Sequence, residues 1–276
     1  MEEALILQIS RVLDEVRRKK PLIHHITNYV TVNDCANIVL AIGASPIMAD
    51  DIGEAEAIAA ISSALVLNIG TLNGRTLESM LAAGKKANAC HIPVVLDPVG
   101  AGASELRNRA TERLLHEVRV SVLLGNLSEI RFAAGLNAAT KGVDVSDADL
   151  ESGAEISRAT AEKAARELGC VAAVTGATDM ISDGSRTLAI RNGVRRLSAV
   201  TGTGCMCTSL VGTFCGATDD CLIAAAGGVL SMGIAGELAE ESAGGRGNGS
   251  FHIAIIDAVS GLSADILAGR AKIDEA

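Results

Sequence analysis

The chain has 276 residues and a formal net charge of −9, which argues against nucleic acid as a partner because phosphate backbones require basic surfaces. Its length allows one large α/β domain or two small ones, and we expect one domain over residues 1–276. Because 49% of the residues are hydrophobic but only 1% are aromatic, the core must consist mainly of Ala, Val, Leu and Ile, which suits helices packed on parallel strands.

The chain is predicted to begin with an amphipathic helix. Apolar residues recur at helical spacing over residues 2–20, with charged residues between them, and Pro21 ends the pattern. Residues 21–32 form a short apolar stretch with several hydrogen-bonding side chains, which indicates either an edge strand or a loop at a site. His24 and His25 in this stretch could supply a base or a ligand, but such a pair in an apolar run is more often structural.

Two more helices are expected before the middle of the chain. The first covers residues 33–42, with Asn33 or Asp34 available as its cap and Gly43 as its end. The second is rich in alanine and extends from residue 54 to about residue 63. We assign the alanine-rich helix to the core and give it no functional role.

Apolar runs and helices then alternate along the middle of the chain. The runs cover residues 64–70, 93–98, 120–124 and 170–175, and the helices cover residues 74–88, a segment ending near residue 118, and residues 153–168. This alternation predicts an α/β fold of three layers, with a mainly parallel central sheet and helices on both faces. Ligands of such sheets bind at the carboxyl ends of the strands.

The last part of the chain is predicted to hold a hairpin, a strand and helices. Residues 180–182 and 187–190 flank Asp183-Gly184-Ser185, which is a turn signal between two strands. The run over residues 195–200 is expected to be a further strand. Two or three helices follow it, including one over residues 222–241.

The cysteines and the hydropathy pattern bear on where the protein is found. Seven cysteines, an odd number, lie mostly in apolar runs with no signal peptide ahead of them, so we expect reduced thiols in the cytoplasm. Their spacing lacks the CxxC pairs of common zinc sites. No uninterrupted apolar run of about 18 residues is present, and we expect no membrane partner.

Two carboxylates follow neighbouring predicted strands. Asp97 ends one strand beside a glycine-rich loop, and Glu129 lies in the stretch Gly125-Asn126-Leu127-Ser128-Glu129 after the next strand. Such a pair suits Mg²⁺, which usually takes one or two carboxylates plus substrate phosphates. The structural alternatives are that Asp97 caps the following turn and that Glu129 completes a capping box that begins at Asn126.

The stretch Thr201-Gly202-Thr203-Gly204-Cys205 predicts an anion-binding helix entrance. It precedes the long apolar segment over residues 206–216, its glycines allow a ligand to approach the backbone, and the first N–H groups of a helix attract anions. Cys205 would lie in the first turn, where the helix dipole lowers the pKa of a thiol. The alternative is a glycine-rich loop with a buried cysteine.

Seven short motifs occur in order along nearly the whole chain. They are Ile26-Thr27-Asn28, Gly43-Ala44-Ser45-Pro46-Ile47-Met48, Leu67-Asn68-Ile69-Gly70-Thr71-Leu72, Leu96-Asp97-Pro98-Val99-Gly100-Ala101-Gly102, Gly125-Asn126 with Glu129, Val174-Thr175-Gly176, and Thr201-Gly202-Thr203-Gly204-Cys205. Each motif is weak alone, but the set resembles the hydroxyethylthiazole kinase family. The resemblance implies a ribokinase-like fold, phosphorylation of 4-methyl-5-(2-hydroxyethyl)thiazole by ATP with Mg²⁺ for thiamine salvage, and a homotrimer with thiazole pockets between subunits.

The resemblance also implies roles for single residues. These are thiazole contacts at Met48, Gly202 and Asn28, nucleotide contacts at Thr175, Leu124, Asn126 and Gly204, metal and phosphate contacts at Asp97 and Glu129, and a place at the reacting centre for Cys205. Leu124 departs from the family pattern, because an arginine that contacts ATP commonly precedes Gly-Asn. The lost charge-assisted donor puts the affinity for the nucleotide, or the choice of nucleotide, in doubt.

The residues also allow other activities. The nearest alternative is a ribokinase-like kinase of another small ring alcohol, of the hydroxymethylpyrimidine or pyridoxal type. A nucleotide-dependent dehydratase on the same fold and a non-catalytic ligand sensor are more distant alternatives. Cys205 could act as a weak base or as a positioning group, because related kinases resemble this chain but have an aspartate base at that position.

Overall fold

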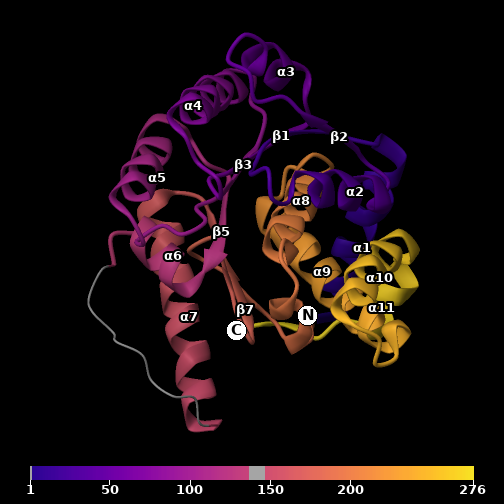
Figure 1. Cartoon of the computed structure of the whole chain (residues 1–276). Helices are drawn as coiled ribbons and strands as arrows, with labels where there is room; N and C mark the ends of the chain where they lie inside the picture. The colour runs from indigo at the N-terminus through magenta and orange to yellow at the C-terminus, as the bar shows by residue number, and fades with distance from the viewer. Residues whose placement is uncertain (1, 137–146) are drawn as a thin grey trace.

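A mixed sheet forms the centre of the molecule in the computed structural model, which describes residues 2–136 and 147–276 (Figure 1). The order across the sheet is β2-β1-β3-β4-β5-β6-β7-β8-β9. The strands are β1 (Leu22–Ile26), β2 (Ser45–Met48), β3 (Ala64–Asn68), β4 (Val94–Asp97), β5 (Val122–Asn126), β6 (Val171–Thr175), β7 (Asp179–Ser182), β8 (Thr187–Ile190) and β9 (Ile273–Glu275). The six strands from β1 to β6 are parallel and β6 to β9 are antiparallel, which confirms the mainly parallel sheet.

Helices cover both faces of this sheet, which confirms the three-layer α/β fold (Figure 1). The helices that share one apolar cluster are α3 (Ala55–Ile61), α4 (Gly74–Ala89), α5 (Glu105–Glu117), α6 (Leu127–Ala133) and α7 (Asp147–Leu168). The helices of the other cluster are α1 (Glu2–Lys19), α2 (Val32–Ile42), α8 (Thr203–Cys215), α9 (Cys221–Ala243), α10 (Asn248–Gly261) and α11 (Ala264–Arg270). Aliphatic side chains and alanines fill both clusters, as the low aromatic content requires.

Successive side chains of a strand point to opposite faces of the sheet, and β3 shows which face is which. Val66 belongs to the apolar cluster of α8 and α9, whereas Leu65 and Leu67 belong to the cluster of α4 and α5. All three are buried because helices cover both faces. Every second residue of a parallel strand therefore faces α8.

Two local expectations were wrong, and a third was right in one of its alternatives. Residues 195–199 form a 3₁₀ helix, η1 (Arg195–Ala199), and not a strand: Leu197 packs on α9, close to Gly236, and none of the described strands pairs with this segment. Helix α2 begins one residue earlier than expected, with Thr31 as its N-cap, so Asn33 and Asp34 lie inside the helix. Residues 21–32 hold both an inner strand, β1 between β2 and β3, and a loop, so the edge-strand alternative was wrong while the loop that follows β1 is present.

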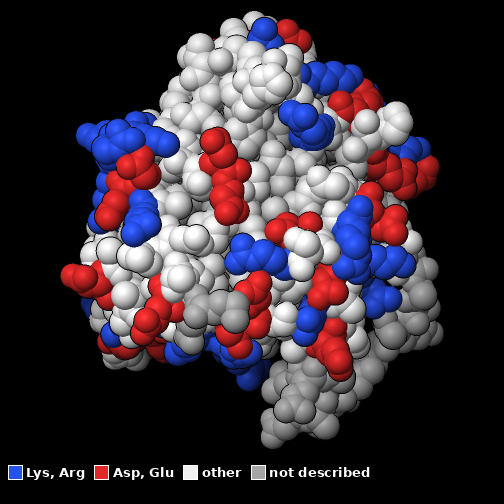
Figure 2. Space-filling view, turned by 180° about the vertical axis from the view of Figure 1, so that it is seen from behind, with Lys and Arg blue, Asp and Glu red and all other residues white. Residues whose placement is uncertain are grey.

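Helix α9 is long and apolar enough to cross a membrane by length and composition, but 83% of its most apolar window is buried in the fold. It lies against α8, α10 and the sheet, which explains its composition as that of a core helix. The charged side chains on the face opposite the view of Figure 1 are of both signs and interspersed (Figure 2). That face presents no continuous basic patch among the described residues.

The packing of α8 against α9 depends on Gly228. A Cβ atom built on Gly228 would lie 2.5 Å from the backbone nitrogen of Val211 and 2.6 Å from its Cα. The backbones of the two helices therefore touch at this point. This contact helps to fix the position of α8 relative to the sheet.

Gly228→Ala is expected to lower the free energy of unfolding by about 1–3 kcal/mol, because the added methyl group overlaps the backbone of α8. Gly153 in α7 provides the control, since no atom lies within 4 Å of a Cβ built there, and Gly153→Ala should raise stability by about 0.5–1 kcal/mol. Urea unfolding followed by circular dichroism measures both changes. A Gly228→Ala protein as stable as the wild type would contradict the close contact.

Candidate active site

Four polar side chains line the carboxyl edge of the sheet on the face that α8 covers. Each of them ends a strand. They are Asn68 of β3, Asp97 of β4, Asn126 of β5 and Thr175 of β6. Asn68 and Asn126 lie two positions after Val66 and Leu124, which belong to the apolar cluster of α8, and side chains two positions apart in a strand face the same side. Asn68 pairs with Asp97 in the register of β3 and β4, and Asn126 pairs with Thr175 in that of β5 and β6. The strands thus bring these groups into one row.

Helix α8 begins at the predicted glycine-rich stretch, which confirms the helix entrance. Gly202 is the N-cap with φ 88°, a left-handed backbone, and a Cβ there would lie 2.9 Å from Cγ2 of Thr31. The first intrahelical bond is donated by Met206 to the carbonyl of Gly202. The backbone N–H groups of Thr203, Gly204 and Cys205 have no acceptor in the part of the chain that the structure describes. They are available to an anion.

A buried hydrogen-bond network surrounds Cys205. The amide nitrogens of Asn28 and Asn68 each lie 3.3 Å from its sulfur. Asn68 Nδ2 also donates to Oδ2 of Asp97 at 2.7 Å, and the hydroxyl of Thr208 donates to the same oxygen at 2.9 Å. Asn28 Nδ2 donates in turn to Oδ1 of Asn68 at 3.0 Å. The network therefore joins β3, β4, α8 and the loop after β1.

The electrostatics of Cys205 differ from the expectation. Burial, followed by the nearby charge of Asp97, raises the pKa of its thiol above the ordinary value. The expectation that the helix dipole lowers this pKa was wrong, because desolvation outweighs the favourable end of α8. Cys205 is therefore a neutral thiol at neutral pH.

Asp97 and Glu129 form the acidic part of the row. Burial, followed by repulsion from Glu129, raises the pKa of Asp97 to about 7. Glu129 accepts hydrogen bonds from the backbone N–H of Gly100 at 2.8 Å and of Asn126 at 2.9 Å. The second bond belongs to a capping box at the start of α6, so the structural alternative for Glu129 is present in the molecule.

These two carboxylates fit a hard cation. Neither has a lysine or arginine partner within the described residues, and Oδ1 of Asp97 has no hydrogen-bond donor there. No group of three or more candidate ligand side chains occurs in that part of the chain. An ion that takes two carboxylates and completes its shell with substrate oxygens and water, such as Mg²⁺, matches this donor set.

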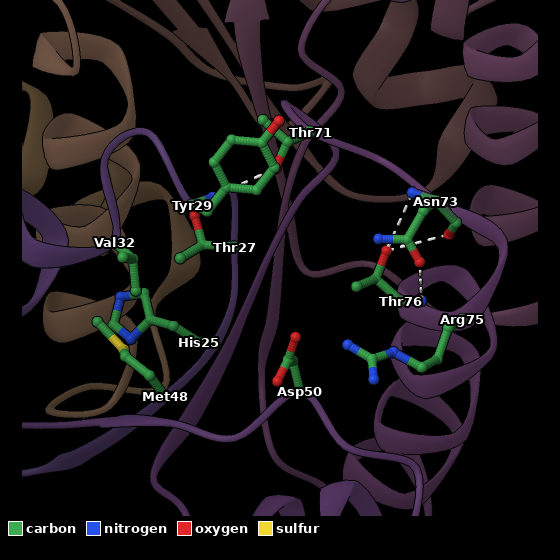
Figure 3. A pocket seen from close by; sticks show the side chains of 10 residues that line it. All are labelled: His25, Thr27, Tyr29, Val32, Met48, Asp50, Thr71, Asn73, Arg75 and Thr76. Carbon is green, nitrogen blue, oxygen red and sulfur yellow. Dashed lines mark hydrogen bonds between the residues drawn. The ribbon is translucent and has the colours of Figure 1, made fainter.

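A cavity of about 230 Å³ lies beside the network (Figure 3). It is lined by His25, Thr27, Tyr29, Val32, Met48, Asp50, Thr71, Asn73, Arg75 and Thr76. Met48 and Val32 give one wall an apolar surface, while the first turn of α4 gives the opposite wall polar groups (Figure 3). Asn28 lies in the chain between the lining residues Thr27 and Tyr29, which connects the cavity to Cys205. Gly202, expected near the same ligand, is not among the lining residues of this single chain.

The two adjacent histidines are structural in their hydrogen bonding. His24 Nε2 bonds the carbonyl of Ala49 at 2.7 Å. His25 bonds the carbonyl of Ile23 through Nδ1 and the hydroxyl of Ser209 through Nε2, and burial lowers its pKa to about 4. Since a carbonyl oxygen only accepts, Nδ1 of the neutral ring carries the proton. His25 therefore contributes a neutral wall to the cavity.

The expected nucleotide residues are found in different surroundings. Asn126 and Gly204 are exposed and Thr175 is half-buried, with its hydroxyl donating to the carbonyl of Gly125 at 3.2 Å. Leu124 is 2% exposed and belongs to the apolar core, so the structure does not place its side chain where a nucleotide could contact it. The expectation for Leu124 is corrected accordingly.

Sequence reasoning passed over Asn68 and Thr208. Asn68 ends an apolar strand just as Asp97 does, and this shared position is a signal in the sequence that could have identified it. Thr208 lies inside the apolar helix α8, where nothing in the sequence separates it from a core threonine. Only the fold shows that it faces Asp97.

The comparisons with known proteins agree with one another. The model of the hydroxyethylthiazole kinase family matches residues 13–265. A hydroxyethylthiazole kinase of Clostridium beijerinckii is 60% identical over 275 residues and 100% of both chains, and one of Ruminiclostridium cellulolyticum is 62% identical over 268 residues and 97% of both chains.

Two solved structures extend this similarity to the fold. The hydroxyethylthiazole kinase protein from Pyrococcus horikoshii OT3 is 40% identical, with a TM-score of 0.88 over 97% of this chain and 98% of that chain. The pyridoxal kinase from Staphylococcus aureus is 14% identical, with a TM-score of 0.62 over 79% of this chain and 88% of that chain. At this identity the comparison shows only that the ribokinase-like fold is shared. With the seven motifs in order at this sheet edge and a family match over most of its length, the chain belongs to the hydroxyethylthiazole kinase family.

Proposed function

We propose that this chain, as one kinase domain over residues 1–276, transfers the γ-phosphoryl group of ATP to the hydroxyl of 4-methyl-5-(2-hydroxyethyl)thiazole in thiamine salvage. The observation that carries the proposal is the contact between Asn28, beside the cavity, and Cys205 in the first turn of α8. The ring pocket, the anion-binding helix end and the buried carboxylate of Asp97 thus adjoin one another. Phosphoryl transfer needs positioning and charge compensation more than covalent help from the protein.

The thiazole alcohol is proposed to bind in the cavity with its hydroxyl toward the network. Met48 offers an apolar surface to the ring. Asn28 lies where the cavity meets Cys205, so it suits the hydroxyl end of the ligand. Gly202 is proposed to approach the substrate closely, since its left-handed backbone leaves no room for a side chain beside Thr31.

The nucleotide is proposed to lie along the other half of the row. Asn126 and Thr175 end β5 and β6 beside each other, and Gly204 presents a free N–H group at the start of α8. The helix end would stabilise the charge on the transferring phosphoryl group. Leu124 would leave the nucleotide without a charged side-chain donor at its position, which favours a weaker or less selective nucleotide site.

Asp97 and Glu129 are proposed to hold Mg²⁺, which when bound neutralises charge on the phosphates. The two carboxylates lack basic partners in the described chain, and burial, followed by repulsion from Glu129, raises the pKa of Asp97. A cation between them would relieve that repulsion. Asn68 and Thr208 hold one oxygen of Asp97 and leave the other free for this role.

Cys205 is proposed to orient the reacting hydroxyl. Its raised pKa makes it a poor base at neutral pH. An aliphatic alcohol is not deprotonated before attack in a loose transition state, so a strong base is not required.

We also propose a homotrimer in which neighbouring subunits complete the thiazole pockets. Tyr29, which lines the cavity, and the adjacent Val30 are strongly exposed although apolar. Exposed apolar residues at the rim of a ligand cavity favour an interface there. The seven cysteines are free, and we infer a reducing, cytoplasmic location.

The proposed function predicts release of ADP that depends on the thiazole alcohol. Purified protein with ATP and Mg²⁺ should turn over 4-methyl-5-(2-hydroxyethyl)thiazole with a higher kcat/KM than hydroxymethylpyrimidine or pyridoxal, because the small cavity suits a five-membered ring. A coupled assay for ADP across these alcohols measures the preference. Higher kcat/KM for one of the other rings would support that alternative, and no alcohol-dependent ADP would contradict the kinase.

Substitution of Cys205 tests its part in the reaction. Cys205→Ala is expected to lower kcat because the reacting hydroxyl loses the group that orients it, but by less than the about 10²–10⁴-fold that is typical of losing a general base. Steady-state rates of Cys205→Ala and Cys205→Asp with the same substrate give the comparison. An unchanged kcat in Cys205→Ala would remove any catalytic role, and a faster Cys205→Asp would show that a base is useful at this position.

Asp97→Asn separates function from stability. Its kcat should fall by about 10²-fold or more, because a neutral amide oxygen holds a cation much more weakly than a carboxylate does. The folded-state pKa of Asp97, about 7, exceeds the ordinary value of 3.8, so the folded chain binds more protons and wild-type stability falls as pH rises from about 4 to 7. Asp97→Asn should therefore gain stability relative to the wild type across this window. Urea unfolding at several pH values in the presence of EDTA measures the free energy of unfolding of both proteins. The same pH dependence in wild type and Asp97→Asn would contradict a raised pKa of the buried carboxyl group.

A further inference from the structure

We propose that Asn68 is a positioning residue for phosphoryl transfer, whose amide group holds Asp97 and Cys205 in one fixed arrangement. This inference rests on the proposed kinase function and assigns a role to a residue that the family motifs left without one. Asn68 touches both groups that face the reacting atoms, although it need not touch the substrate itself.

The hydrogen bonds of Asn68 use its whole amide group. Nδ2 donates one proton to Oδ2 of Asp97 at 2.7 Å and lies 3.3 Å from Sγ of Cys205. Oδ1 accepts from the backbone N–H of Gly70 at 2.9 Å and from Nδ2 of Asn28 at 3.0 Å. Two donors and two acceptors fix the orientation of an asparagine without ambiguity, because a flipped amide would place donors against donors.

The fold leaves Asn68 no freedom to move. It is 2% exposed, ends the inner strand β3, and lies directly opposite Asp97 in the register of β3 and β4. Val66, two residues earlier, faces the same side and packs in the cluster of α8. The sheet therefore fixes the position of Asn68. Through its hydrogen bonds, Asn68 in turn orients the thiol of Cys205 on α8 and the carboxylate of Asp97 on β4.

The arrangement leaves specific atoms of its partners free. Asn68 and Thr208 both donate to Oδ2 of Asp97, so Oδ1 is the oxygen left for the site. The two amides of Asn28 and Asn68 lie against the sulfur of Cys205 as donors, so the S–H proton must point away from them. Small misplacements of groups at a reacting centre reduce rates strongly.

Oδ1 and Nδ2 of Asn68 have separable tasks. Oδ1 closes a turn to Gly70, two residues on, which a serine hydroxyl can also close, although more weakly. A serine hydroxyl is too short to reach both Asp97 and Cys205 as the amide does. Asn68→Ser therefore keeps the turn and removes the positioning contacts, while Asn68→Ala removes both.

The kinetic test compares these variants with Asn88→Ala. Asn88 is a half-buried residue whose amide makes two hydrogen bonds to the backbone of Arg119, and neither residue belongs to the site. Asn68→Ala and Asn68→Ser should lower kcat by about 10²-fold, with KM for the thiazole alcohol and for ATP little changed, and Asn88→Ala should keep the wild-type values. Wild-type kcat in Asn68→Ser, or a loss confined to KM, would overturn the proposal.

A second readout does not need activity. The pKa of the Cys205 thiol, read from the pH dependence of its alkylation by iodoacetamide in the absence of substrates and followed by peptide mass spectrometry, should rise in Asn68→Ala and Asn68→Ser, because an amide N–H that stabilises the thiolate is gone. The exposed Cys90 serves as internal reference. An unchanged or lower pKa of Cys205 would overturn the proposal even in an active enzyme. If the wild type fails to phosphorylate the thiazole alcohol while this pKa rises in the variants, the proposed function has failed and the contact between Asn68 and Cys205 has been confirmed.

Discussion

The site depends on the burial of one carboxyl group, that of Asp97. An ionised carboxylate loses much of its hydration at 4% exposure, and no lysine or arginine among the described residues compensates it. Two neutral donors, the amide of Asn68 and the hydroxyl of Thr208, offset part of this penalty. The remaining imbalance, increased by Glu129, favours any ligand that brings positive charge to the free oxygen. Low polarity also makes such an interaction stronger than it would be in water.

The geometry around Asp97 follows from two features of the backbone. Parallel strands end at one edge and alternate their side chains, so Asn68, Asp97, Asn126 and Thr175 face α8 in a row. Helix α8 lies close to this row because its backbone touches that of α9 at Gly228 and its own first turn begins at Gly202. The free N–H groups of α8 and the buried carboxylate of Asp97 therefore lie at the same edge of the sheet. The N–H groups suit a phosphate and the carboxylate suits a cation, so this edge combines binding groups for both.

Many of the strands and helices can be predicted from local patterns of the sequence, whereas the remaining features depend on tertiary contacts. The long apolar runs identified β3 to β6, and the glycine-rich stretch identified the start of α8, because both signals are local. The run at residues 195–200 was predicted to be a strand, but none of the described strands pairs with it and Leu197 packs on α9. The short C-terminal strand β9 was missed because three residues carry too little pattern. For single groups the limit is burial: Cys205 was assigned a lowered pKa from its place in the helix, whereas desolvation raises it.

The presence of a thiol at position 205 is consistent with this charge balance. Two amide groups point donors at the sulfur, an environment that would also suit an anionic side chain. A carboxylate there would, however, add a third acidic group to the site of Asp97 and Glu129, where the nearby Arg107 already donates to the backbone carbonyls of Ile69, Gly70 and Val99. A neutral thiol accepts the same donors weakly and adds no charge, so it does not further destabilise the ionised form of Asp97. Stability and a stronger base are therefore opposing demands at this position, and cysteine satisfies the first.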